Sequence, residues 1–547
     1  MFVNRWFGLG LGLLACSVQA QLTQNITLGN PKALALGHAV TADPPGLDSI
    51  HFNPAGLAKI KGRQQQFKLL MASMEITSET GSQQNSPAVI DAFNQINEGQ
   101  TFPVDDQANL KASTSEPLLM LPFQGLTEVP FIIAPFGGMA AQVPGEPWTV
   151  ATTVYTPQSI GFIRDREKDP GSYQGYQMAI SRITYFSPSI GIQLTDTLAA
   201  GLSIGLSWHG FGTVTKFRAP EQTLIFVGGA ATQLQNAGID LALLGAFDNV
   251  GDLTLEMEDA LSPSFNVGLL WEPTSWLAFG FVYQSEAKAQ MEGDFKMEYT
   301  EEFLGTTVDL LPISPALGLL GGATFNAGEV EKGHVEMEMI VPQHISVGTS
   351  IKVLPDLKMN FDVKWTEFSK WDTLTISFDQ NVDFLNLGSV INQVSAGFGV
   401  GDNADPNELR LPRHYQDVFS WALGFEYDWD DRMVLRFGYE PRGSAVPDDR
   451  VDFLVPLADA TLFSVGMGYQ LSKYTRFDIG LAYLHSEFDA DVVQVLDENG
   501  EVVDVVGESL NANDTTPGQV VYNPYAYLPI RGETSAYLFS LSYDEKF

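Results

Sequence analysis

Residues 419–440, FSWALGFEYDWDDRMVLRFGYE, hold two runs of alternating side chains around a short polar turn. Along 419–429, every second side chain is aromatic or leucine, and the residues between them are Ser420, Ala422, Gly424, Glu426 and Asp428. The run 433–440 repeats the pattern with Met433, Leu435, Phe437 and Tyr439. A period of two places each set on one face of a β-strand. The stretch therefore predicts a β-hairpin with one apolar face and one small or charged face.

The same alternation recurs along the chain. It is found at 201–208, 265–271, 345–353, 357–366, 463–471 and 476–485. A soluble sandwich would hide the apolar face against a second sheet. Here the opposite face carries Gly, Ser, Asp, Arg and Glu, which suits the interior of a wide barrel whose apolar face meets lipid. Trp271, Trp276 and Trp429 fall at strand ends, where an interfacial aromatic girdle is expected.

The links between these strands alternate between short and long. The short turns are 196–199, 272–275, 354–356, 430–432 and 472–474, and the long segments are 215–262, 291–342, 368–414, 441–460 and 489–532. Transmembrane barrels have short periplasmic turns and long external loops. We therefore predict an all-β, antiparallel transmembrane barrel of about fourteen strands. Its first three strands, near 64–75, 116–137 and 147–157, are interrupted by Pro and Gly.

The chain ends in AYLFSLSYDEKF, residues 536–547, which alternates again and is expected to close the barrel. Both ends of the chain then lie on the periplasmic side. The terminal Phe547 resembles the aromatic residue read by outer-membrane assembly machinery, which makes that machinery an expected partner.

The N-terminus predicts export to the outer membrane of a Gram-negative bacterium. Arg5 and the apolar run 6–15 fit a signal peptide over residues 1–20, with cleavage after Ala20. Lipidation at Cys16, the only cysteine, is the alternative. The formal net charge of -36 argues against nucleic acid, whose phosphates attract Lys and Arg. Outer-membrane lipid and lipopolysaccharide are the expected surroundings, and we expect a monomer.

Residues 21–62 precede the first strand of the barrel, which we place over 63–547. They are rich in small residues and are broken by Pro44 and Pro45. A disordered periplasmic tail is one interpretation. The apolar content of the segment favours a plug inside the lumen, because a solvated tail is usually more polar.

Several segments together resemble the FadL family of outer-membrane long-chain fatty acid transporters. They are NPAGLA at 53–58 after ALGHAVTAD at 35–43, the strand pairs within 341–374 and 415–450, and DIGLAYLHSE at 478–487. The resemblance implies a fourteen-stranded barrel with an N-terminal hatch over 21–62. It also implies capture in a groove between two external loops, rearrangement of the hatch, an inward kink of one strand and lateral release into the membrane, without energy input.

The loops 215–262 and 291–342 match the capture role because external loops rarely need long apolar segments. The candidate groove residues are Leu224, Ile225, Phe226, Leu243, Leu244, Phe303, Leu310, Leu311, Leu317, Leu319 and Leu320. The alternative is that most of them only pack one loop against the other.

A fatty acid brings a carboxylate into an apolar place, where it needs a cation. Lys216 and Arg218 follow a strand at the entry of the first capture loop, and Arg410 and Arg413 precede the Tyr415 strand. Balancing the many acidic residues is an equally good explanation for each of these cations.

Two sites are candidates for the hatch and its gating. Asn53-Pro54-Ala55 predicts a fixed bend, because Pro restricts the backbone and Asn can cap it. It is also compatible with a plain turn. Pro157, in the third strand, cannot donate to a sheet ladder and would create the lateral opening there. The alternative is that this strand simply ends at Thr156.

No pattern indicates an enzyme, a cofactor or a metal. The G-x-S-x-G match at 201–205 lies within an alternating run, whereas a nucleophile elbow needs a strand-to-helix turn. The seven histidines have no metal-ligand spacing. Asn499-Gly500 predicts a hairpin rather than a calcium site.

The sequence therefore predicts uptake of long-chain fatty acids by passive diffusion. Uptake of alkanes or aromatic hydrocarbons is the first alternative, and a scarcity of cations in the inner lumen would favour it. A surface adhesin or structural barrel is the second, and a disordered hatch together with loops that carry no groove would favour it. An outer-membrane lipid hydrolase is the third, but no Ser and His pair stands at an informative spacing.

Overall fold

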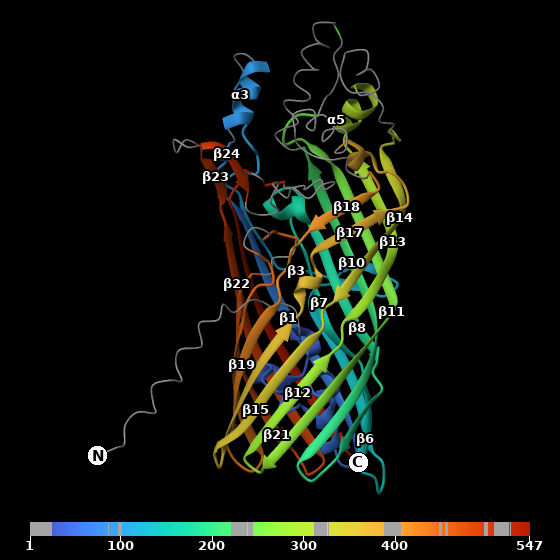
Figure 1. Ribbon diagram of the computed structural model, residues 1–547, viewed down its shortest axis with the longest axis vertical. Helices are drawn as coiled ribbons and strands as arrows, with labels where there is room; N and C mark the ends of the chain where they lie inside the picture. Colours follow the sequence, from blue (N-terminus) through green and yellow to red (C-terminus); the bar gives the residue numbers. More distant parts are fainter. Residues whose placement is uncertain are drawn as a thin grey trace, which may run out of the picture.

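The structure is a computed structural model that describes residues 25–85, 87–96, 101–219, 238, 244–310, 325–326, 328–387, 406–447, 451–454, 458–496, 502–507, 524–525 and 527–547. The chain forms a closed antiparallel barrel of 14 strands (Figure 1). β1 (Arg63–Thr80) pairs along its length with β25 (Ile530–Lys546), which closes the barrel. The predicted fold class is confirmed.

Several strands of the barrel consist of two consecutive segments. In chain order the wall is built of β1, β2 (Lys111–Thr114) with β5 (Ile132–Gln142), β6 (Trp148–Thr153) with β7 (Tyr155–Ile163), β8 (Gln177–Phe186) with β9 (Ser189–Gln193), β10 (Leu198–Arg218), β11 (Asn249–Thr274), β12 (Leu277–Gln284) with β13 (Ala287–Tyr299), β14 (Val330–Val341) with β15 (His344–Leu354), β16 (Leu357–Thr366) with β17 (Thr373–Phe378), β18 (Glu408–Pro412) with β19 (Val418–Asp428), β20 (Met433–Arg442), β21 (Ala460–Gln470), β22 (Thr475–Ala490) and β25. β23 (Val492–Leu496) and β24 (Val502–Gly507) form a separate hairpin around the predicted Asn-Gly turn, which itself lies outside the described residues.

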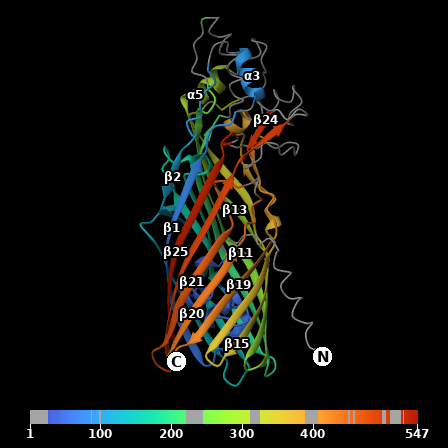
Figure 2. The same cartoon turned by 90° about the vertical axis from the view of Figure 1, so that its left-hand side faces the viewer.

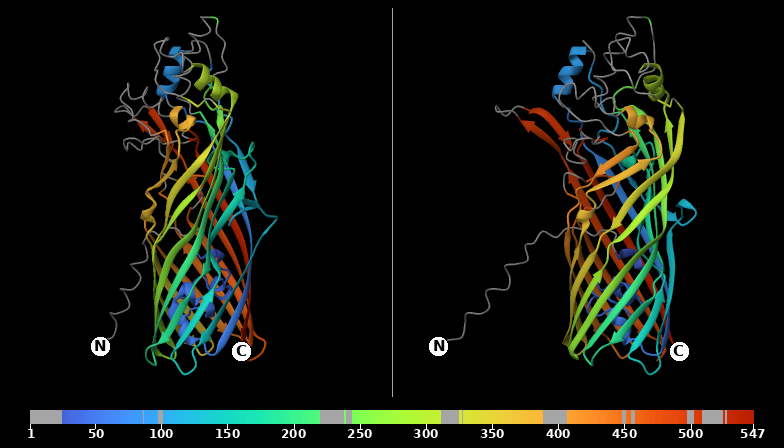
Figure 3. Two further views of the ribbon diagram at one scale, coloured as in Figure 1. Left: turned by 90° about the vertical axis from the view of Figure 1, so that its right-hand side faces the viewer. Right: turned by 45° about the vertical axis from the view of Figure 1, so that its right-hand side comes forward.

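Short turns join the strands at the end drawn at the bottom of Figure 1, where the C-terminus also lies. The long connections lie at the opposite end, as the spacing of the runs predicts. However, three of them are shorter than expected, because parts of the predicted segments 215–262, 291–342 and 368–414 are strand rather than loop. These parts are residues 249–262 of β11, 291–299 of β13, 330–341 of β14, 373–378 of β17 and 408–412 of β18. Figure 3 shows the strands within residues 249–341, coloured green to yellow, reaching towards the end that carries the long connections.

The first of these strand segments differs from the lower strands because the buried side chains change from one face of β11 to the other along its length. In residues 265–271 the exposed side chains are apolar, and Asn266 and Leu270 are buried. In residues 253–258 the buried side chains are Leu253, Leu255 and Met257, and polar residues alternate with them. A register shift between these parts sets Asp259 and Ser262 opposite His209 and Ser207, so β11 has one residue more than β10 there. Such a bulge exchanges the two faces of a strand.

We call residues 249–258 of β11 with β13 and β14 the upper wall. Its outer face is polar and includes exposed Glu292, Asp294, Glu336 and Glu338. We call residues 262–274 of β11 with β12, β15, β16, β19 and β20 the lower wall. Its outer face carries the apolar residues expected against lipid, and Trp271 and Trp429 are exposed near the short turns, as predicted.

The second strand of the barrel is interrupted between its segments β2 and β5, and the chain leaves the wall there. Its middle part forms β3 (Glu116–Leu121) and β4 (Gly125–Glu128), a hairpin that pairs with β7 only through Glu116 and Pro117. Leu118 and Met120 of this hairpin bury themselves against Ala179 of β8 and Trp208 of β10. β1 therefore pairs with β5 up to Ala72 and with β2 from Ile76 onward, and its ladder is interrupted between them.

Residues 25–60, which we call the hatch, lie inside the lower part of the barrel, where they are drawn in dark blue in Figures 1 and 2. The hatch contains η1 (Ile26–Leu28), α1 (Pro31–Ala35), η2 (Gly46–Asp48), α2 (Ser49–Phe52) and η3 (Pro54–Lys59). The Asn30 side chain caps α1 by accepting a hydrogen bond from the amide of Ala33. No helix in the described part of the chain combines the length and apolar character needed to cross a membrane.

Glycines in the wall let the hatch approach the strands closely. A Cβ on Gly201 would stand 2.1 Å from the Pro54 carbonyl carbon, and one on Gly280 would stand 2.1 Å from the Thr41 carbonyl oxygen. The other helices of the described residues are α3 (Pro87–Ile96), η4 (Pro170–Gln174), α5 (Glu301–Leu304) and η5 (Gly305–Leu310) in the external connections, and η7 (Phe368–Lys370), which lies between β16 and β17.

Candidate ligand-binding site

An extended group of buried apolar residues fills the upper part of the barrel interior. We call it the upper apolar cluster. Its members include Ile76, Phe162, Met178, Ile180, Phe217, Leu253, Met257, Met291, Phe295, Met297, Phe303, Met337, Met339, Phe378 and Leu409. Methionine is frequent here, and Met291 of β13 lies directly opposite Met337 of β14. Unbranched, polarizable thioether side chains can adapt to apolar partners of different shape.

The two predicted capture loops meet in this cluster. The amide of Leu244, from the first loop, donates to the Thr306 hydroxyl of the second at 2.7 Å. Phe303 is fully buried and stacks on Tyr299 with ring centroids 4.4 Å apart. Among the described residues, Leu244 and Phe303 thus pack the loops together, and Leu310 ends η5. The other predicted groove residues, Leu224, Ile225, Phe226, Leu243, Leu311, Leu317, Leu319 and Leu320, lie outside the described residues.

The predicted cations at the entry of the first capture loop are engaged by neighbouring loops. Arg218 forms a two-point ion pair with Asp105, at 2.5 and 2.8 Å. Lys216 donates to the Arg166 carbonyl at 3.2 Å. Both cations also lie over the ring of Tyr173, at about 5 Å. Burial raises the pKa of Tyr173 to about 12, so its phenol stays neutral.

Arg410 and Arg413 also have acidic partners. Arg413 is fully buried and pairs with Asp452, which is buried as well. Arg410 pairs with Glu408 of the same strand and is partly exposed. Neither arrangement leaves a guanidinium free for a ligand without loss of an existing ion pair.

A further cation, Arg182 of β8, lies deeper in the barrel and was not predicted from the sequence. Its guanidinium donates to the Ser264 hydroxyl at 3.0 Å and to the Ser207 hydroxyl at 3.3 Å. Within the described ranges, no carboxylate forms an ion pair with it. The sequence does not predict this site, because it is formed only by the pairing of β7, β8, β10 and β11.

Arg182 marks a boundary along one face of β8. Met178 and Ile180, above it on this face, belong to the upper apolar cluster. Thr184, below it, pairs with Tyr155, whose ring meets His51 of the hatch with centroids 5.3 Å apart. The cation therefore lies where the apolar interior meets the polar surroundings of the hatch.

His209 of β10 stands directly opposite Arg182 in the ladder. It is completely buried, and both its ring nitrogens lack a hydrogen-bond partner among the described residues. Buried polar atoms without a partner are rare in folded proteins and call for a specific explanation. A neutral imidazole and a guanidinium side by side can together donate to a carboxylate.

The hatch below this site is fixed to the wall by buried polar contacts. Glu440 of β20 accepts from His38 of the hatch at 2.8 Å, from Lys364 at 2.7 Å and from Arg442 at 2.8 Å. Asp48 of the hatch pairs with Lys68 of β1 at 2.6 Å. Nearly all of these atoms are buried, so separating the hatch from the wall would leave charges unpaired.

The predicted hatch motif lies at the contact with β10 and β11. The Asn53 side chain donates to the Thr41 carbonyl at 2.8 Å and to the Leu269 carbonyl at 3.1 Å, and accepts from the Ala55 amide at 3.1 Å. Asn53 therefore caps η3, which begins at Pro54, and also ties the hatch to β11.

Pro157 lies inside β7, so the third strand does not end at Thr156. The pairing of β7 with β8 is irregular between Tyr155 and Gln158. The first described residues of the hatch contact this point, since the Thr27 hydroxyl donates to the Thr156 carbonyl at 2.9 Å and the Asn25 amide donates to the Pro157 carbonyl at 3.3 Å. Together these features link the hatch, the irregular strand and the Arg182 site.

Comparisons with known proteins agree with this architecture. Residues 13–547 match the model of the family described as outer membrane protein transport protein (OMPP1/FadL/TodX). A long-chain fatty acid transport protein of Escherichia coli O6:H1 is 22% identical over 41% of this chain and 42% of its own length. A 47 kDa outer membrane protein of Pasteurella multocida is 24% identical over 40% of this chain and 42% of its own. The alignments thus span less than half of these relatives.

Solved structures share the fold over nearly the whole chain. A FadL homologue of Pseudomonas aeruginosa superposes with a TM-score of 0.62 at 14% identity, covering 97% of this chain and 100% of the other. The toluene transporter TodX of P. putida gives a TM-score of 0.54 at 13% identity, covering 95% and 99%. The toluene transporter TbuX of Ralstonia pickettii also gives 0.54, at 14% identity and with coverage of 95% and 99%.

Proposed function

Because this chain belongs to the OMPP1/FadL/TodX family of outer-membrane transport proteins, we propose that it takes up long-chain fatty acids by passive diffusion. It is an outer-membrane β-barrel, and the family and its structural neighbours are transport channels rather than enzymes. The family includes transporters of fatty acids and of aromatic hydrocarbons, so the choice of cargo depends on the residues of this chain.

Arg182 is the observation that favours a fatty acid. A hydrocarbon needs only an apolar interior. A cation beside its path would lose hydration energy and would gain no interaction with the cargo. A fatty acid has an apolar chain and a carboxylate, and the upper apolar cluster and Arg182 are arranged in that order along β8. The buried His209, whose ring nitrogens have no partner within the described ranges, supplies a second donor at the same level.

We further propose that the cargo enters between the external loops and reaches Arg182 with its carboxylate leading. The hatch contacts at Thr156 and Pro157 lie beside this site, so a carboxylate bound there can displace them and release the hatch. Capture by the two loops, movement of the hatch at Asn53-Pro54-Ala55 and lateral release into the outer membrane remain parts of this proposal.

The test is ligand binding to the detergent-purified, delipidated protein. Oleate and a long n-alkane are titrated against the native chain, Arg182→Gln, and a control, Arg432→Gln, in an exposed periplasmic turn. Hydrogen bonds to charged groups contribute about 1.5–3 kcal/mol, so Arg182→Gln is expected to weaken oleate binding by about tenfold or more. Binding of the alkane should not change in either variant.

Two further variants, Arg410→Gln and Arg413→Gln, test the cations predicted from the sequence. We expect Arg410→Gln to have little effect on oleate, because this side chain pairs with Glu408 near solvent. Equal binding of oleate and alkane, with no effect of Arg182→Gln, would instead assign the protein to hydrocarbon uptake.

A further inference from the structure

We propose that His209 accepts the proton of the incoming fatty acid, so that the head group crosses the upper interior as the neutral acid and is held at Arg182 as a carboxylate. The inference rests on the proposed function, because it names the form in which the cargo reaches the Arg182 site and the residue that changes this form. Arg182 cannot take this role itself, since a guanidinium keeps its protons in proteins.

A carboxylate on its way through the upper apolar cluster would meet cations that already have partners. Among the described residues around the cluster, Arg413 is paired with Asp452, Arg218 is paired with Asp105, and Arg164 donates to two backbone carbonyls. A carboxylate without a partner is costly in an apolar place, whereas the neutral acid loses much less hydration. The neutral acid is therefore the form in which the head group can cross this region.

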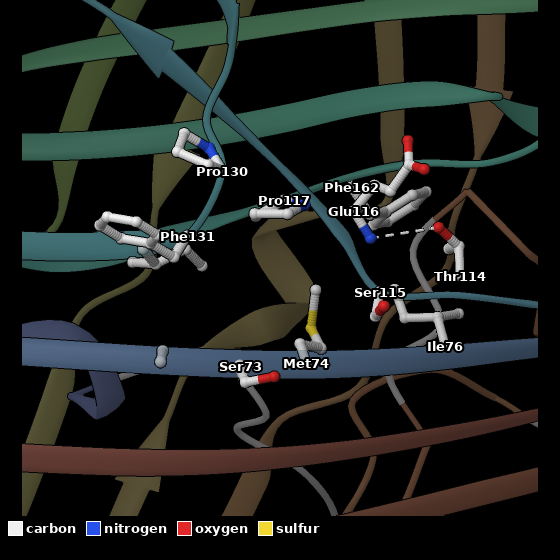
Figure 4. Close-up of a pocket in the computed structure, with 12 residues that line it drawn as sticks. Ser73, Met74, Ile76, Thr114, Ser115, Glu116, Pro117, Pro130, Phe131 and Phe162 are labelled. Atoms are coloured by element: carbon white, nitrogen blue, oxygen red, sulfur yellow. Dashed lines mark hydrogen bonds between the residues drawn. The ribbon is translucent and has the colours of Figure 1, made fainter.

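The edge of the cluster beside β1 is apolar as well. Figure 4 shows Met74 of β1 and Phe162 of β7 around one crevice in the wall, together with Pro117. Glu116 is the one residue with a carboxyl group among those that line this crevice, and it is exposed. Along this edge the cluster thus presents carbon and sulfur atoms rather than buried charges.

His209 can take a proton because its ring is not otherwise engaged. The side chain is completely buried, and neither ring nitrogen has a hydrogen-bond partner among the described residues. A neutral imidazole has one N–H and one nitrogen lone pair. The lone pair can accept the proton of a carboxylic acid, and the imidazolium then lies beside the carboxylate that the transfer has produced.

The groups that surround His209 leave no described carboxylate free to stabilise an imidazolium. Arg182 stands opposite it in β8, and Asp259 stands opposite it in β11, where the Asp259 carboxylate accepts from two backbone amides at 2.9 and 3.0 Å. Tyr155 and the hatch residue His51 lie near Arg182, and the His51 ring is held within the hatch. A cation formed at His209 is therefore favourable only when the cargo brings an anion, which ties the proton to the cargo.

The transfer is complete with the groups present at the site. The O–H bond of the head group breaks, an N–H bond forms at a ring nitrogen of His209, and the electron pair of the broken bond stays on the carboxylate. The carboxylate then has two cationic donors, the imidazolium and the guanidinium of Arg182, which the Ser207 and Ser264 hydroxyls hold in place. Departure of the cargo reverses the transfer, because two cations would otherwise remain side by side without an anion.

The experiment counts the protons taken up when oleate binds to the full-length protein in an uncharged detergent. At about pH 8.5 free oleate is ionised and free His209 is neutral, so a complex of carboxylate and imidazolium holds one proton more than the separated partners. Calorimetric titrations in two buffers of different ionisation enthalpy should show uptake of about one proton per bound oleate, and the Kd should rise about tenfold per pH unit. Methyl oleate, which has no acidic proton, should bind without proton uptake.

His209→Gln keeps a hydrogen-bond donor at the site and removes the proton acceptor. We expect oleate to bind this variant without proton uptake and with a Kd that no longer changes with pH. The control is His344→Gln, because His344 is also buried but its ring is held by the Thr366 hydroxyl at 2.8 Å. This control should take up the proton as the native protein does. Proton uptake that persists in His209→Gln would overturn the inference.

A measurement on the native protein keeps the test independent of how well His209→Gln folds. Oleate labelled with ¹³C at its carboxyl group has different NMR chemical shifts as an acid and as a carboxylate, so the native complex reports the form of the head group directly. We expect the carboxylate shift together with proton uptake. The acid shift, or a carboxylate without proton uptake, would rule out His209 as the acceptor. Failure of Arg182→Gln to weaken oleate binding would instead overturn the proposed function, whatever the proton count.

Discussion

The lower wall and the upper wall use the same alternation of side chains in opposite phase. In the lower wall, Phe265 and Leu269 face outward and Asn266 faces the hatch. In the upper wall, Met257 and Met291 face inward and Glu292 and Glu336 face outward. The difference shows that alternation of apolar side chains locates a strand but does not say whether its apolar face meets lipid or the barrel interior. That depends on whether the strand segment lies above or below the bulge in β11.

The two interiors also differ in what holds them together. The lower interior holds the hatch through buried ion pairs and hydrogen bonds, such as those to Glu440 and Asp362. The upper interior is filled largely by apolar side chains, although it also contains the buried ion pair of Arg413 with Asp452. In the proposed uptake of a fatty acid, the cargo would exchange apolar contacts in the upper interior for polar contacts at Arg182 and the hatch below it.

Removal of the Glu440 charge should produce the largest loss of stability. Glu440→Gln leaves Lys364 and Arg442 buried without their carboxylate, and breaking a buried ion pair costs about 3–5 kcal/mol. We expect a decrease of this size in the free energy of unfolding measured with denaturant in detergent.

The matched control is Glu272→Gln, because Glu272 pairs with Lys59 of the hatch but both side chains are about 40% exposed. Exposed ion pairs contribute about 0–1 kcal/mol, so this variant should unfold almost like the native protein. Equal losses in the two variants would contradict the view that the hatch is held by buried charges.

The boundary between the two walls is tested by arginine substitutions on their outer faces. Phe265→Arg places a charge against lipid six residues from Trp271 of the expected interfacial girdle, and should cost about 2–4 kcal/mol towards the centre of the membrane. Gln290→Arg, on the outer face of the upper wall beside Glu338 and Asp259, should cost nothing or stabilise slightly. Unfolding free energies in lipid vesicles measure both, and a similar penalty at the two positions would place the upper wall in the membrane.

The sequence predicted the lower wall well, because lipid outside and polar groups inside give the alternation that a barrel requires. Residues 419–440 form β19 and β20 around the expected turn, and β1 begins at Arg63 as expected. The upper wall alternates too, in GDLTLEME at 251–258, but in the inverted phase, and the prediction of a continuous loop over 215–262 is wrong there. The site at Arg182 depends on strand register across four strands, which no single segment contains.

The hatch motif allows a smaller test of how the two compartments communicate. Asn53→Ala removes the cap of η3, worth about 0.5–2 kcal/mol, together with the bonds to the Thr41 and Leu269 carbonyls. We expect faster hydrogen exchange in the hatch and unchanged exchange in the upper wall. Asn266→Ala is the control, since Asn266 also donates to the hatch, at the Ile50 carbonyl, but caps no helix. If both variants exchange alike, the cap has no special role in hatch stability.

The smallest effect is expected in the upper interior, where packing tolerates a change of shape. Met337→Leu conserves volume, and such exchanges in a core usually cost less than about 1.5 kcal/mol. Met337→Gln buries an amide at the same place without a predictable partner and should cost more, as an unsatisfied polar group costs about 1–3 kcal/mol. Denaturant unfolding compares the two variants. Met337 lies opposite Met291 on the inner face of a wall whose outer face is polar. Met337→Gln can lose clearly more unfolding free energy than Met337→Leu only if water is excluded from this inner face. If both variants were equally mild, water would have to reach the upper interior, and an apolar cargo would gain little by entering it.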